Sequence, residues 1–503
     1  MIRGYAVPDV RAAEDLVRAG LPEGALMLRA AGGLADVVAR RARRRGATRV
    51  VVLAGPGDNG GDALHAAAML MADLAGEGVR VAAVGVATAL HAGGAAAARA
   101  SGVSVLTVDP GADRLPDEVV RVVASADLVV DGLLGIGGRP GLRGAMASVV
   151  DTVPDTAYLV AVDLPSGADP EGLEPLGVAV YADETVTFGP AKPVHLLPAT
   201  SAAVGRLTVL DIGVEPGARP VVERVEAGDV ARMWPVPGPG DHKYTRGVLA
   251  VVAGSDAYPG AAVLCVTAAV EAGAGMVRYV GPPRASGLVL AACPEVVPGP
   301  GRVQAAVVGP GVSPPASEHR DGKDHQLDAV RQALTDEAPL VVDAGALEVL
   351  AGWLVQGHRR TAPTLLTPHT GELARLLGTL DGGEVTREEV DAAPVQHARR
   401  AAALTGCTVL LKGWTTLVVD PDPEVPLRSQ ADAPAWLATA GAGDVLAGLA
   451  GALLTAGLTP LDAGSVAALV HGTAAHLANP GGPVRALAVA RALPLAVARL
   501  LAV

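Results

Sequence analysis

Short, uninterrupted apolar runs alternate with amphipathic stretches along the first 210 residues. The run Val50–Ala54 has no polar position, as expected for a strand that is buried on both faces of a sheet. Further strands are expected at Val79–Val84, Val103–Val108, Leu128–Asp131, Tyr158–Asp163, Thr185–Phe188 and Leu207–Leu210, and helices at 11–45, 63–75, 92–100 and 116–124. Strands separated by helices predict a parallel sheet covered by helices on both faces.

The alternation stops in a segment rich in Pro and Gly, Gly213–Gly240, and then resumes. This segment is the best candidate for a linker, so we predict two domains, residues 1–217 and 225–503. Strands of the second domain are expected at Val248–Val252, Met276–Val280, Ala305–Val308, Leu340–Asp343, Thr364–Leu366, Val409–Lys412 and Leu417–Val419, with a helix over 260–273 and a polar surface insertion over 312–328. The fold class is α/β, with two doubly wound domains.

Composition narrows the class of protein. The net charge of −12 argues against a general nucleic-acid surface, and the basic run Arg40–Arg45 is short enough to be a solvated helix end. The three cysteines have neither metal-ligand spacing nor the number of a disulfide framework, which indicates a reducing, cytoplasmic compartment. The N-terminus lacks a signal-peptide pattern and no uncharged apolar run reaches about 18 residues, so no membrane span is expected.

The stretch Ala438–Leu449 (ATAGAGDVLAGL) carries the clearest chemical signal of the second domain. It predicts a glycine-rich turn that opens a helix, with Asp444 in the first helical turn. Free N–H groups and the positive end of the helix dipole would attract a phosphate there. Asp444 is then either a capping acid or a base placed beside a bound anion.

Two other strand ends of the second domain carry polar side chains that could belong to the same crevice. Lys412 ends one strand and could meet a phosphate, and His369 lies in a turn after another. An anion site next to one carboxylate is the arrangement of phosphoryl transfer, although no Walker A loop is present. A lone histidine is also compatible with a purely structural role.

Polar loops follow three strands of the first domain: Gly55–Asp62, Asp131–Gly144 and Asp163–Gly167. Ligands of parallel α/β sheets bind beyond the carboxyl ends of the strands, where these loops are expected. The polar side chains there could contact sugar hydroxyls, phosphate or a hard cation; they are Asp58, Asn59, Asp62, Asp131, Asp163 and Ser166. The alternative is that they only cap strand ends.

The first half resembles the NAD(P)H-hydrate epimerase family over about residues 9–212. The motifs that carry this resemblance occur in order: GPGDNGGDA (55–63), DGLLGIG (131–137), VDLPSG (162–167) and TVTFGPAKPVHLLP (185–198). Asp58 stands where the family has Asn, Ala63 where it has Gly, and Leu28 where it usually has an acid. The resemblance implies a Rossmann-like three-layer sandwich.

The second half, over about residues 240–475, resembles the ADP-dependent NAD(P)H-hydrate dehydratase family, which has a ribokinase-like fold. The matching motifs are HKYTRG (242–247), VVAGSDAYPGAA (251–262), GPG (309–311), LTPHTGELARL (366–376), LLKGWTT (410–416) and ATAGAGDVLAG (438–448). Both halves fused in this order are characteristic of bifunctional NAD(P)H-hydrate repair enzymes. The implied function is epimerisation of R and S NAD(P)HX and dehydration of the S form to NAD(P)H, with ADP converted to AMP and phosphate.

The resemblance also implies roles for individual residues. Asp444 and Asp163 would be the catalytic groups, Asn59, Asp131 and Ser166 would hold a potassium ion, and a magnesium ion would accompany ADP. Substrate contacts would come from Asp58, Asn59, Gly60, Gly61, Asp62, Gly135, Ile136, Gly137, Gly138, Arg139 and Asp163 in the first half, and from Ala262, Gly311, His369 and Asp444 in the second. Nucleotide contacts would come from Lys412, Gly413, Trp414, Thr415, Thr416 and Gly443.

The implied partners are NADHX, NADPHX and ADP or AMP, and members of both families commonly form homo-oligomers. The alternative function is a ribokinase-like kinase of a small alcohol, because such a kinase needs the same anion site and base. In that case the first half would be a non-catalytic binding module.

Overall fold

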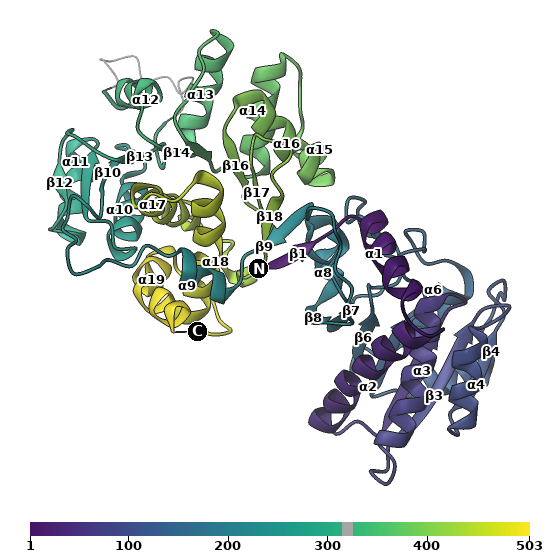
Figure 1. Cartoon of the computed structure of the whole chain (residues 1–503). Helices are drawn as coiled ribbons and strands as arrows, with labels where there is room; N and C mark the ends of the chain where they lie inside the picture. Colours follow the sequence, from purple (N-terminus) through teal and green to yellow (C-terminus); the bar gives the residue numbers. More distant parts are fainter. Residues whose placement is uncertain (314–324, 503) are drawn as a thin grey trace. The chain divides into compact units, whose positions relative to one another are not determined.

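The computed structural model describes residues 1–313 and 325–502, and the chain forms two compact units (Figure 1). One unit is Arg3–Val222, and the other is Glu223–Val503 together with Met1–Ile2. The predicted linker over 213–240 is wrong in part, because strand β9 (Val222–Arg224) and helix α9 (Ala227–Met233) form within it. Val230 of α9 and Trp234 directly after it are buried in the core of the second unit, and Val222 of β9 is buried as well. Strand β1 (Ile2–Gly4) crosses the unit boundary, since Ile2 belongs to one unit and Gly4 to the other.

The first unit is built on a parallel sheet with the strand order β4-β3-β2-β5-β6-β7-β8. All seven strands lie where the sequence predicts strands. Their bounds are β2 Arg49–Ala54, β3 Arg80–Val86, β4 Ser104–Val108, β5 Leu128–Gly132, β6 Tyr158–Val162, β7 Glu184–Phe188 and β8 Arg206–Leu210. The predicted parallel sheet is therefore confirmed, and its carboxyl ends carry the polar loops.

Helices cover both faces of this sheet, as strand alternation requires. Val50 and Val52 of β2 face one core, shared with α2, α3 and α4, while Val51 and Leu53 face the other, shared with α5 and α6. The predicted three-layer, Rossmann-like arrangement is confirmed. The helix bounds are α1 Val7–Ala19, α2 Ala25–Arg45, α3 Asp58–Asp73, α4 Ala92–Ala100, α5 Asp117–Ala124, α6 Gly144–Asp151, α7 Pro193–Leu196 and α8 Pro198–Val204.

Helix α3 begins five residues earlier than predicted, at Asp58 instead of residue 63. The glycines suggest a loop, but Gly60 and Gly61 lie inside the first helical turns. A Cβ on Gly60 would lie 2.1 Å from the Gly55 carbonyl oxygen, so glycine is needed there for close packing against the end of β2. The free N–H groups of the helix N-terminus therefore reach directly into the predicted site.

The second unit is built on a sheet whose order from β9 is β9-β18-β17-β16-β15-β14-β13-β10-β11-β12. Strands from β16 to β12 in this order pair in parallel, and β16, β17 and β18 pair antiparallel. The predicted strands all occur, and β9, β12 and β18 are additional. Their bounds are β10 Val248–Val252, β11 Met276–Val280, β12 Val297–Pro298, β13 Ala305–Val308, β14 Leu340–Val342, β15 Thr364–Leu366, β16 Thr408–Leu411, β17 Thr416–Val419 and β18 Leu427–Gln430.

Two groups of helices cover this second sheet (Figure 1). Helices α9, α10, α17, α18 and α19 share a large apolar core with Leu249, Val251 and Val307 of the sheet, and α12 to α16 lie on the opposite side. The bounds are α10 Pro259–Glu271, α11 Pro283–Ala292, α12 His325–Thr335, α13 Gly345–Val355, α14 Thr370–Asp381, α15 Arg387–Ala392, α16 Pro394–Thr405, the 3-10 turn η1 Ala435–Leu437, α17 Ala442–Thr455, α18 Pro460–Ala478 and α19 Ala486–Leu501. The prediction of two doubly wound α/β domains is confirmed. Of the predicted insertion over 312–328, residues 314–324 lie outside the described residues, and α12 begins at His325.

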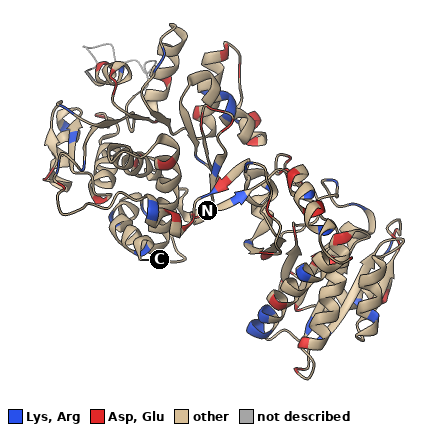
Figure 2. Cartoon of the chain, in the orientation of Figure 1, with Lys and Arg blue, Asp and Glu red and all other residues tan. Residues whose placement is uncertain are grey.

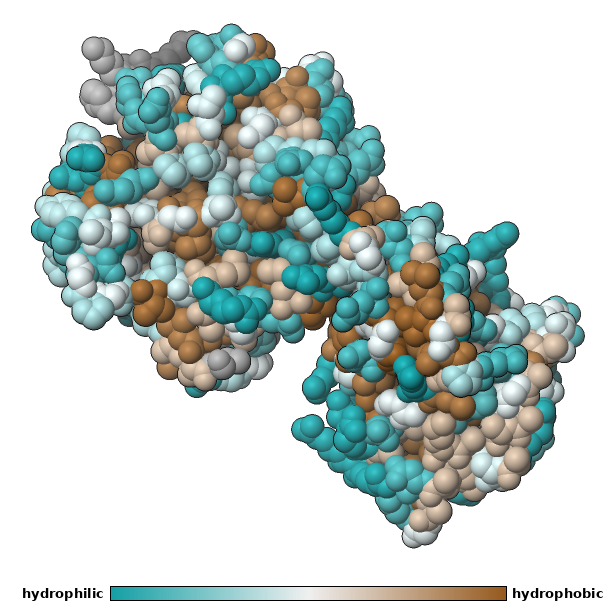
Figure 3. Space-filling view, viewed as in Figure 1, coloured by the Kyte–Doolittle hydropathy of each residue, from teal (hydrophilic) through white to brown (hydrophobic). Residues whose placement is uncertain are grey.

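Charged residues of both signs are distributed over both units (Figure 2). The basic run Arg40–Arg45 lies at the C-terminal end of α2, where Arg43 pairs with Asp73 and Glu77. Polar and apolar residues are mixed on the surface seen in Figure 3, and none of the described helices is long and apolar enough to cross a membrane. The cysteines Cys265, Cys293 and Cys407 are all free and buried.

Candidate functional site

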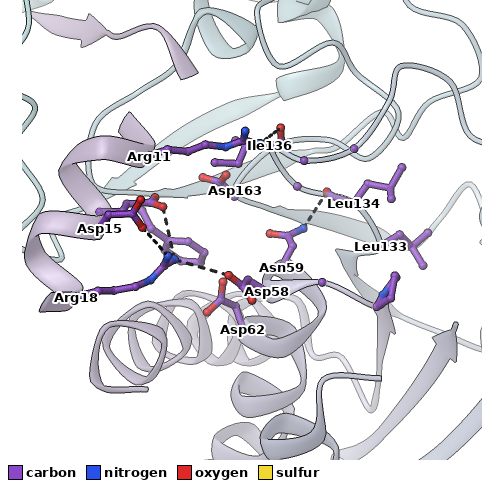
Figure 4. Close-up of a pocket in the computed structure, with 17 residues that line it drawn as sticks. Arg11, Asp15, Arg18, Asp58, Asn59, Asp62, Leu133, Leu134, Ile136 and Asp163 are labelled. Carbon is purple, nitrogen blue, oxygen red and sulfur yellow. Dashed lines mark hydrogen bonds and ion pairs between the residues drawn. The ribbon is translucent and has the colours of Figure 1, made fainter. Parts of the chain in front are cut away.

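A cavity of about 460 Å³ opens at the carboxyl ends of β2, β5 and β6 in the first unit (Figure 4). Polar side chains of α1 and α3 face one another across it, and the loop after β5 forms a further wall. Its lining consists of Arg11, Glu14, Asp15, Arg18, Pro56, Gly57, Asp58, Asn59, Asp62, Leu133, Leu134, Gly135, Ile136, Gly137, Gly138, Asp163 and Phe188.

Asp163 is held at the cavity wall by a buried network. Lys192 Nζ donates to Asp163 Oδ1 over 2.7 Å, and Thr187 Oγ1 donates to the same oxygen over 2.9 Å. Burial alone would raise the pKa of Asp163, but the charge of Lys192 and these hydrogen bonds outweigh it and lower the pKa below its ordinary value. Asp163 is therefore a carboxylate at neutral pH, which suits a proton acceptor.

His195 fixes the backbone of Asp163. The Lys192 backbone N–H donates to His195 Nδ1 over 3.0 Å, so the ring proton is on Nε2, and Nε2 donates to the Asp163 carbonyl oxygen over 2.7 Å. The Asp163 backbone lies in the left-handed region, with φ of 64°. The network thus holds a backbone conformation that few residues adopt readily.

Asn59, which lines the cavity, comes together with the buried residues Asp131 and Ser166. Ser166 Oγ lies 2.7 Å from Asp131 Oδ1, the Ser166 N–H donates to Asp131 Oδ2 over 2.9 Å, and Asn59 Nδ2 donates to the Leu134 carbonyl oxygen over 2.9 Å. The Leu134 N–H donates to Ser166 Oγ over 2.8 Å, so Leu134 joins Asn59 to the other two side chains. Burial raises the pKa of Asp131 to about 6, and no ion pair with Asp131 occurs within the described residues.

Helix α1 contributes side chains to the cavity that the sequence interpretation missed. Arg11 donates to the Ile136 carbonyl oxygen over 2.9 Å, and Arg18 lies 3.7 Å from Asp58 (Figure 4). Burial, together with the nearby charges, raises the pKa of Glu14, and burial beside Asp163 and Asp58 raises that of Asp62 well above its ordinary value. The spacing of polar residues along α1 was the available signal, but it does not distinguish a cavity wall from a solvated helix face.

Most predicted substrate contacts of the first half line this cavity, but three do not. Gly60 and Gly61 are buried in α3, where a Cβ would collide with Gly55 or His91, and Arg139 is exposed outside the lining. Lys192, which the sequence interpretation also missed, lies within the motif TVTFGPAKPVHLLP, so a signal for it was present.

The second unit has a larger cavity, of about 660 Å³, at the N-terminus of α17. Its lining combines polar side chains that follow the strand ends with apolar side chains of η1, α17 and α18. The lining consists of Asp343, Ala344, His369, Glu372, Lys412, Gly413, Trp414, Thr416, Ala433, Pro434, Ala435, Leu437, Ala438, Thr439, Gly441, Ala442, Gly443, Asp444, Leu446, Ala468 and His471.

Asp444 lies in the first turn of α17, as predicted, but does not cap the helix. The N-cap is Gly441 in a left-handed conformation with φ of 86°, and it has no side-chain cap. No hydrogen bond to the Asp444 carboxylate occurs in the described part of the chain. Burial, assisted by the negative charges of Asp343 and Glu372, raises the pKa of Asp444 to about 7. A carboxyl group that titrates near neutral pH is suited to take up and release a proton.

Lys412 lies beside the N-terminus of α17. Its Nζ is 2.9 Å from Asp343 Oδ1 and 3.6 Å from Glu372 Oε2, and a Cβ on Gly443 would be 3.3 Å from it. Burial would lower the pKa of Lys412, but the two carboxylates outweigh burial and raise it. A firmly charged ammonium group and the free N–H groups of a helix start therefore converge on one point, as an anion site requires.

His369 caps helix α14, and its ring is half exposed to the cavity. Its Nδ1 accepts hydrogen bonds from the N–H groups of Gly371 and Glu372, at 3.0 and 3.3 Å, and burial lowers the pKa of the ring. The neutral imidazole thus carries its proton on Nε2. A parallel bridge between His369 and Lys412 holds the two residues at neighbouring strand ends.

Three predicted residues of the second half lie outside this cavity lining. Ala262 is fully buried in α10, and Gly311 adopts φ of 67° where a Cβ would be 2.5 Å from Ala261 Cβ. Thr415 is 4% exposed, whereas Gly413, Trp414 and Thr416 line the cavity.

The sequence interpretation missed Asp343, Glu372 and His471. Asp343 ends a predicted strand and Glu372 lies in a quoted motif, so both had a signal. His471 had none: it is buried in the long apolar helix α18, its pKa is lowered to about 4 by burial, and its Nε2 has no partner among the described residues.

Known protein families match both units of the chain. A family described as NAD(P)H-hydrate dehydratase matches residues 249–491, and one described as the YjeF-related protein N-terminus matches residues 23–194. The chain is 45% identical to the bifunctional NAD(P)H-hydrate repair enzyme Nnr of Mycobacterium tuberculosis over 467 residues, which covers 90% of this chain and 89% of that protein.

Two further proteins are similar to the chain. The enzyme of the same name from Mycobacterium leprae is 43% identical over 489 residues and covers 95% of this chain and 94% of its own length. A crystal structure of the ADP/ATP-dependent NAD(P)H-hydrate dehydratase of Bacillus subtilis, co-crystallised with ATP and Mg²⁺, is 26% identical with a TM-score of 0.48, over 56% of this chain and 99% of that one. The full-length identity to the mycobacterial proteins shows that this chain belongs to the family of bifunctional NAD(P)H-hydrate repair enzymes.

Proposed function

We propose that the two predicted domains of this repair enzyme divide the work: residues 225–503 dehydrate (S)-NAD(P)HX with ADP, and residues 1–217 epimerise the R and S forms. The single observation that carries the proposal for the second domain is the Asp444 carboxyl group. It has a pKa of about 7 and no hydrogen-bond donor within the described residues, and it lies at a helix N-terminus next to Lys412. The family relationship supports repair over the alternative of a small-alcohol kinase.

In the proposed dehydratase step, Asp444 accepts the proton of the carbon-6 hydroxyl group. The resulting oxygen attacks the β-phosphorus of ADP, and the bond from that phosphorus to the bridging oxygen breaks, which leaves AMP. Loss of phosphate from carbon 6 and of a proton from carbon 5 then restores the ring double bond of NAD(P)H. The chain's own contribution is to place the base and to stabilise charge on the transferred phosphoryl group.

Lys412 and the N–H groups around Gly443 are suited to that stabilisation, since both line the cavity and lie next to each other. Gly413, Trp414 and Thr416 line the same cavity and are proposed to contact the nucleotide. Asp343 already pairs with Lys412, and no cluster of three or more His, Cys, Asp or Glu side chains that could hold a metal occurs among the described residues. A magnesium ion is therefore proposed to enter with the phosphates of ADP, which is common for Mg²⁺.

In the epimerase domain, Asp163 is proposed to accept the proton of the carbon-6 hydroxyl group while the bond from carbon 6 to the ring nitrogen breaks, which leaves an aldehyde and a nitrogen that takes up a proton. Addition of that nitrogen to the other face of the aldehyde, with return of a proton to the oxygen, gives the opposite epimer. The lowered pKa supports this role, because the group is ionised before substrate binds. Lys192 and Thr187 keep the carboxylate oriented toward the cavity through Oδ1. Loss of such a base costs about 10²–10⁴ in rate.

The oxygen atoms of Asp131, Ser166 and Asn59 fit a potassium ion. Asp131 supplies a buried carboxylate that has no cationic partner among the described contacts, and Ser166 and Asn59 supply neutral oxygens. One negative charge with several neutral oxygens is a donor set for a hard monovalent cation. When bound, potassium would offset the buried charge of Asp131 and fix the loop after β5.

Further proposals concern the setting of the enzyme. We propose that it accepts both NADHX and NADPHX, forms a homo-oligomer and works in the cytoplasm. The buried, free cysteines support a reducing compartment.

The test uses the full chain with a mixture of R and S NADHX and ADP. The unaltered protein should convert the whole mixture to NADH, Asp163→Asn should stop once the S fraction is consumed, and Asp444→Asn should form very little NADH yet still equilibrate the epimers. NADH is followed by its near-ultraviolet absorbance and the epimers by chromatography. ATP-dependent phosphorylation of a small alcohol without NADH formation would overturn the proposal.

A further inference from the structure

Helix α1 presents a row of charged side chains to the epimerase cavity. Arg11, Glu14, Asp15 and Arg18 are spaced so that they share one helix face, and all four line the cavity. Figure 4 labels Arg11, Asp15 and Arg18. The apolar positions Val7, Val10 and Ala13 are buried instead. The family match to this domain begins at residue 23, so α1 and its charged row lie outside it.

Arg18 lies among three carboxyl groups, but these do not occupy all of its hydrogen-bond donors. Its guanidinium nitrogens are 3.3 Å from Asp15, 3.7 Å from Glu14 and 3.7 Å from Asp58. Only the contact with Asp15 is within hydrogen-bond distance, and half of the Arg18 side chain is exposed. A guanidinium has five N–H donors, so several of them remain available to a ligand.

The charge balance of the cavity makes this cation important. Two guanidinium groups line the cavity, Arg11 and Arg18, together with five carboxyl groups, which are Glu14, Asp15, Asp58, Asp62 and Asp163. Lys192 already pairs with Asp163, and the raised pKa values of Glu14 and Asp62 disfavour their charged forms, so Asp15 and Asp58 are the carboxylates that remain to be offset. Arg11 already donates to the Ile136 carbonyl oxygen. A hydrated dinucleotide carries an anionic pyrophosphate, which the negative charges of Asp15 and Asp58 would repel. Asp58 adds to that repulsion because it is 72% exposed at the start of α3.

We propose that Arg18 is a substrate-binding residue of the epimerase site, where its guanidinium offsets Asp58 and binds the pyrophosphate of the hydrated dinucleotide. This inference rests on the proposed epimerase function of the domain. Arginine suits the task because its planar fork can give two parallel hydrogen bonds to phosphate oxygens. Binding at this point would draw Arg18 from its long ion pairs, which are weak at an exposed position.

The test is epimerisation of the R hydrate by the full chain, with the second domain converting each S product to NADH. Arg18→Gln should raise KM about three- to tenfold with kcat little changed, because binding alone is weakened. The dependence of KM on salt should also fall, since one charge–charge interaction is lost. Asp58→Asn should lower KM, and the double variant should return toward the KM of the unaltered protein.

A matched control is Arg114→Gln, which removes an exposed Arg–Asp pair of the same spacing, with Asp117 at 3.0 Å, outside the cavity lining. It should leave KM unchanged. Dehydration of pure S hydrate confirms that the coupling reaction of the second domain is intact in each variant, and an unchanged kcat of epimerisation confirms that the first domain has folded. An unchanged KM and salt dependence in Arg18→Gln would overturn the inference.

A measurement of NAD⁺ binding tests the role of Arg18 separately from the proposed epimerisation. In an NAD⁺ titration of the full chain with ADP present, the affinity of one site should fall by a similar factor in Arg18→Gln while any binding by the second domain is unchanged, even if no epimerisation is detected. Absence of epimerisation in the unaltered protein would reject the proposed reaction, whereas NAD⁺ affinity that does not depend on Arg18 would reject the role of Arg18.

Discussion

Replacing Asp444 by Asn should strongly reduce NADH formation and, at the same time, make the protein more stable at neutral and higher pH. The substitution keeps the shape of the side chain and removes its charge. Asp444 is partly buried near Asp343 and Glu372, and no hydrogen bond within the described residues stabilises its carboxylate. The folded state therefore resists ionisation of this group, whereas the unfolded chain does not.

The magnitude follows from the pKa. Folding raises the pKa of Asp444 from its ordinary 3.8 to about 7, so the ionised group costs up to about 4 kcal/mol, at about 1.4 kcal/mol for each tenfold change. The cost is absent below pH 4, grows as the pH rises from about 4 to 7, and is constant above pH 7. An asparagine has no such cost, so the stability gained by Asp444→Asn should follow the same course.

Urea unfolding of the two proteins at several pH values measures this difference, and thermal unfolding should show a Tm higher by several degrees at pH 8. NADH formation should fall by about 10²–10⁴ because the base is lost. A variant no more stable than the unaltered protein at pH 8, or a stability gain that does not grow between pH 5 and pH 8, would refute the reasoning.

Three further predictions concern other buried charges. Lys192→Met should move the acidic limb of the pH profile of epimerisation to higher pH, because the pKa of Asp163 rises when the ammonium group 2.7 Å away is removed. An unchanged acidic limb would contradict the pairing of Lys192 with Asp163. Exchange of potassium for choline should slow epimerisation by the unaltered enzyme about tenfold or more, whereas Asp131→Asn should be insensitive to the exchange. Equal sensitivity of the two proteins would argue against a cation beside Asp131. Lys412→Met should raise KM for ADP at least about tenfold while epimerisation continues, and nucleotide titration with each activity assayed separately checks this.

The positions of the strands could be predicted from the sequence because a strand buried on both faces has a local signature. Val50–Ala54 and Val248–Val252 are continuous apolar runs, and both are strands of parallel sheets. The N-terminus of α3 could not be placed, because Gly60 and Gly61 disfavour a helix locally. The close approach of Gly60 to the Gly55 carbonyl group decides the structure, and that contact is tertiary.

The sequence predicted which residues form each site better than it predicted the chemical role of each residue. The sequence pattern of an aspartate in the first turn of a helix is the same whether the residue caps the helix or serves as a base. Only the positions of Gly441, Asp343 and Lys412 show that Asp444 does not cap α17. The pairing of Lys192 with Asp163 joins residues 29 positions apart through two strand ends. Such contacts depend on strand order, which the local pattern does not contain.

The left-handed backbone at Asp163 limits which acid can occupy that position. Among residues other than glycine, asparagine and aspartate adopt positive φ most readily, because their short side chains bond locally to the backbone. Glutamate carries the same carboxyl group but has no such local compensation, and its longer side chain would also displace Lys192 Nζ from its 2.7 Å contact. The left-handed backbone and the contact with Lys192 therefore each favour aspartate at position 163. A change from aspartate to glutamate is ordinarily counted as conservative, but at this position it would disturb both the backbone and that contact.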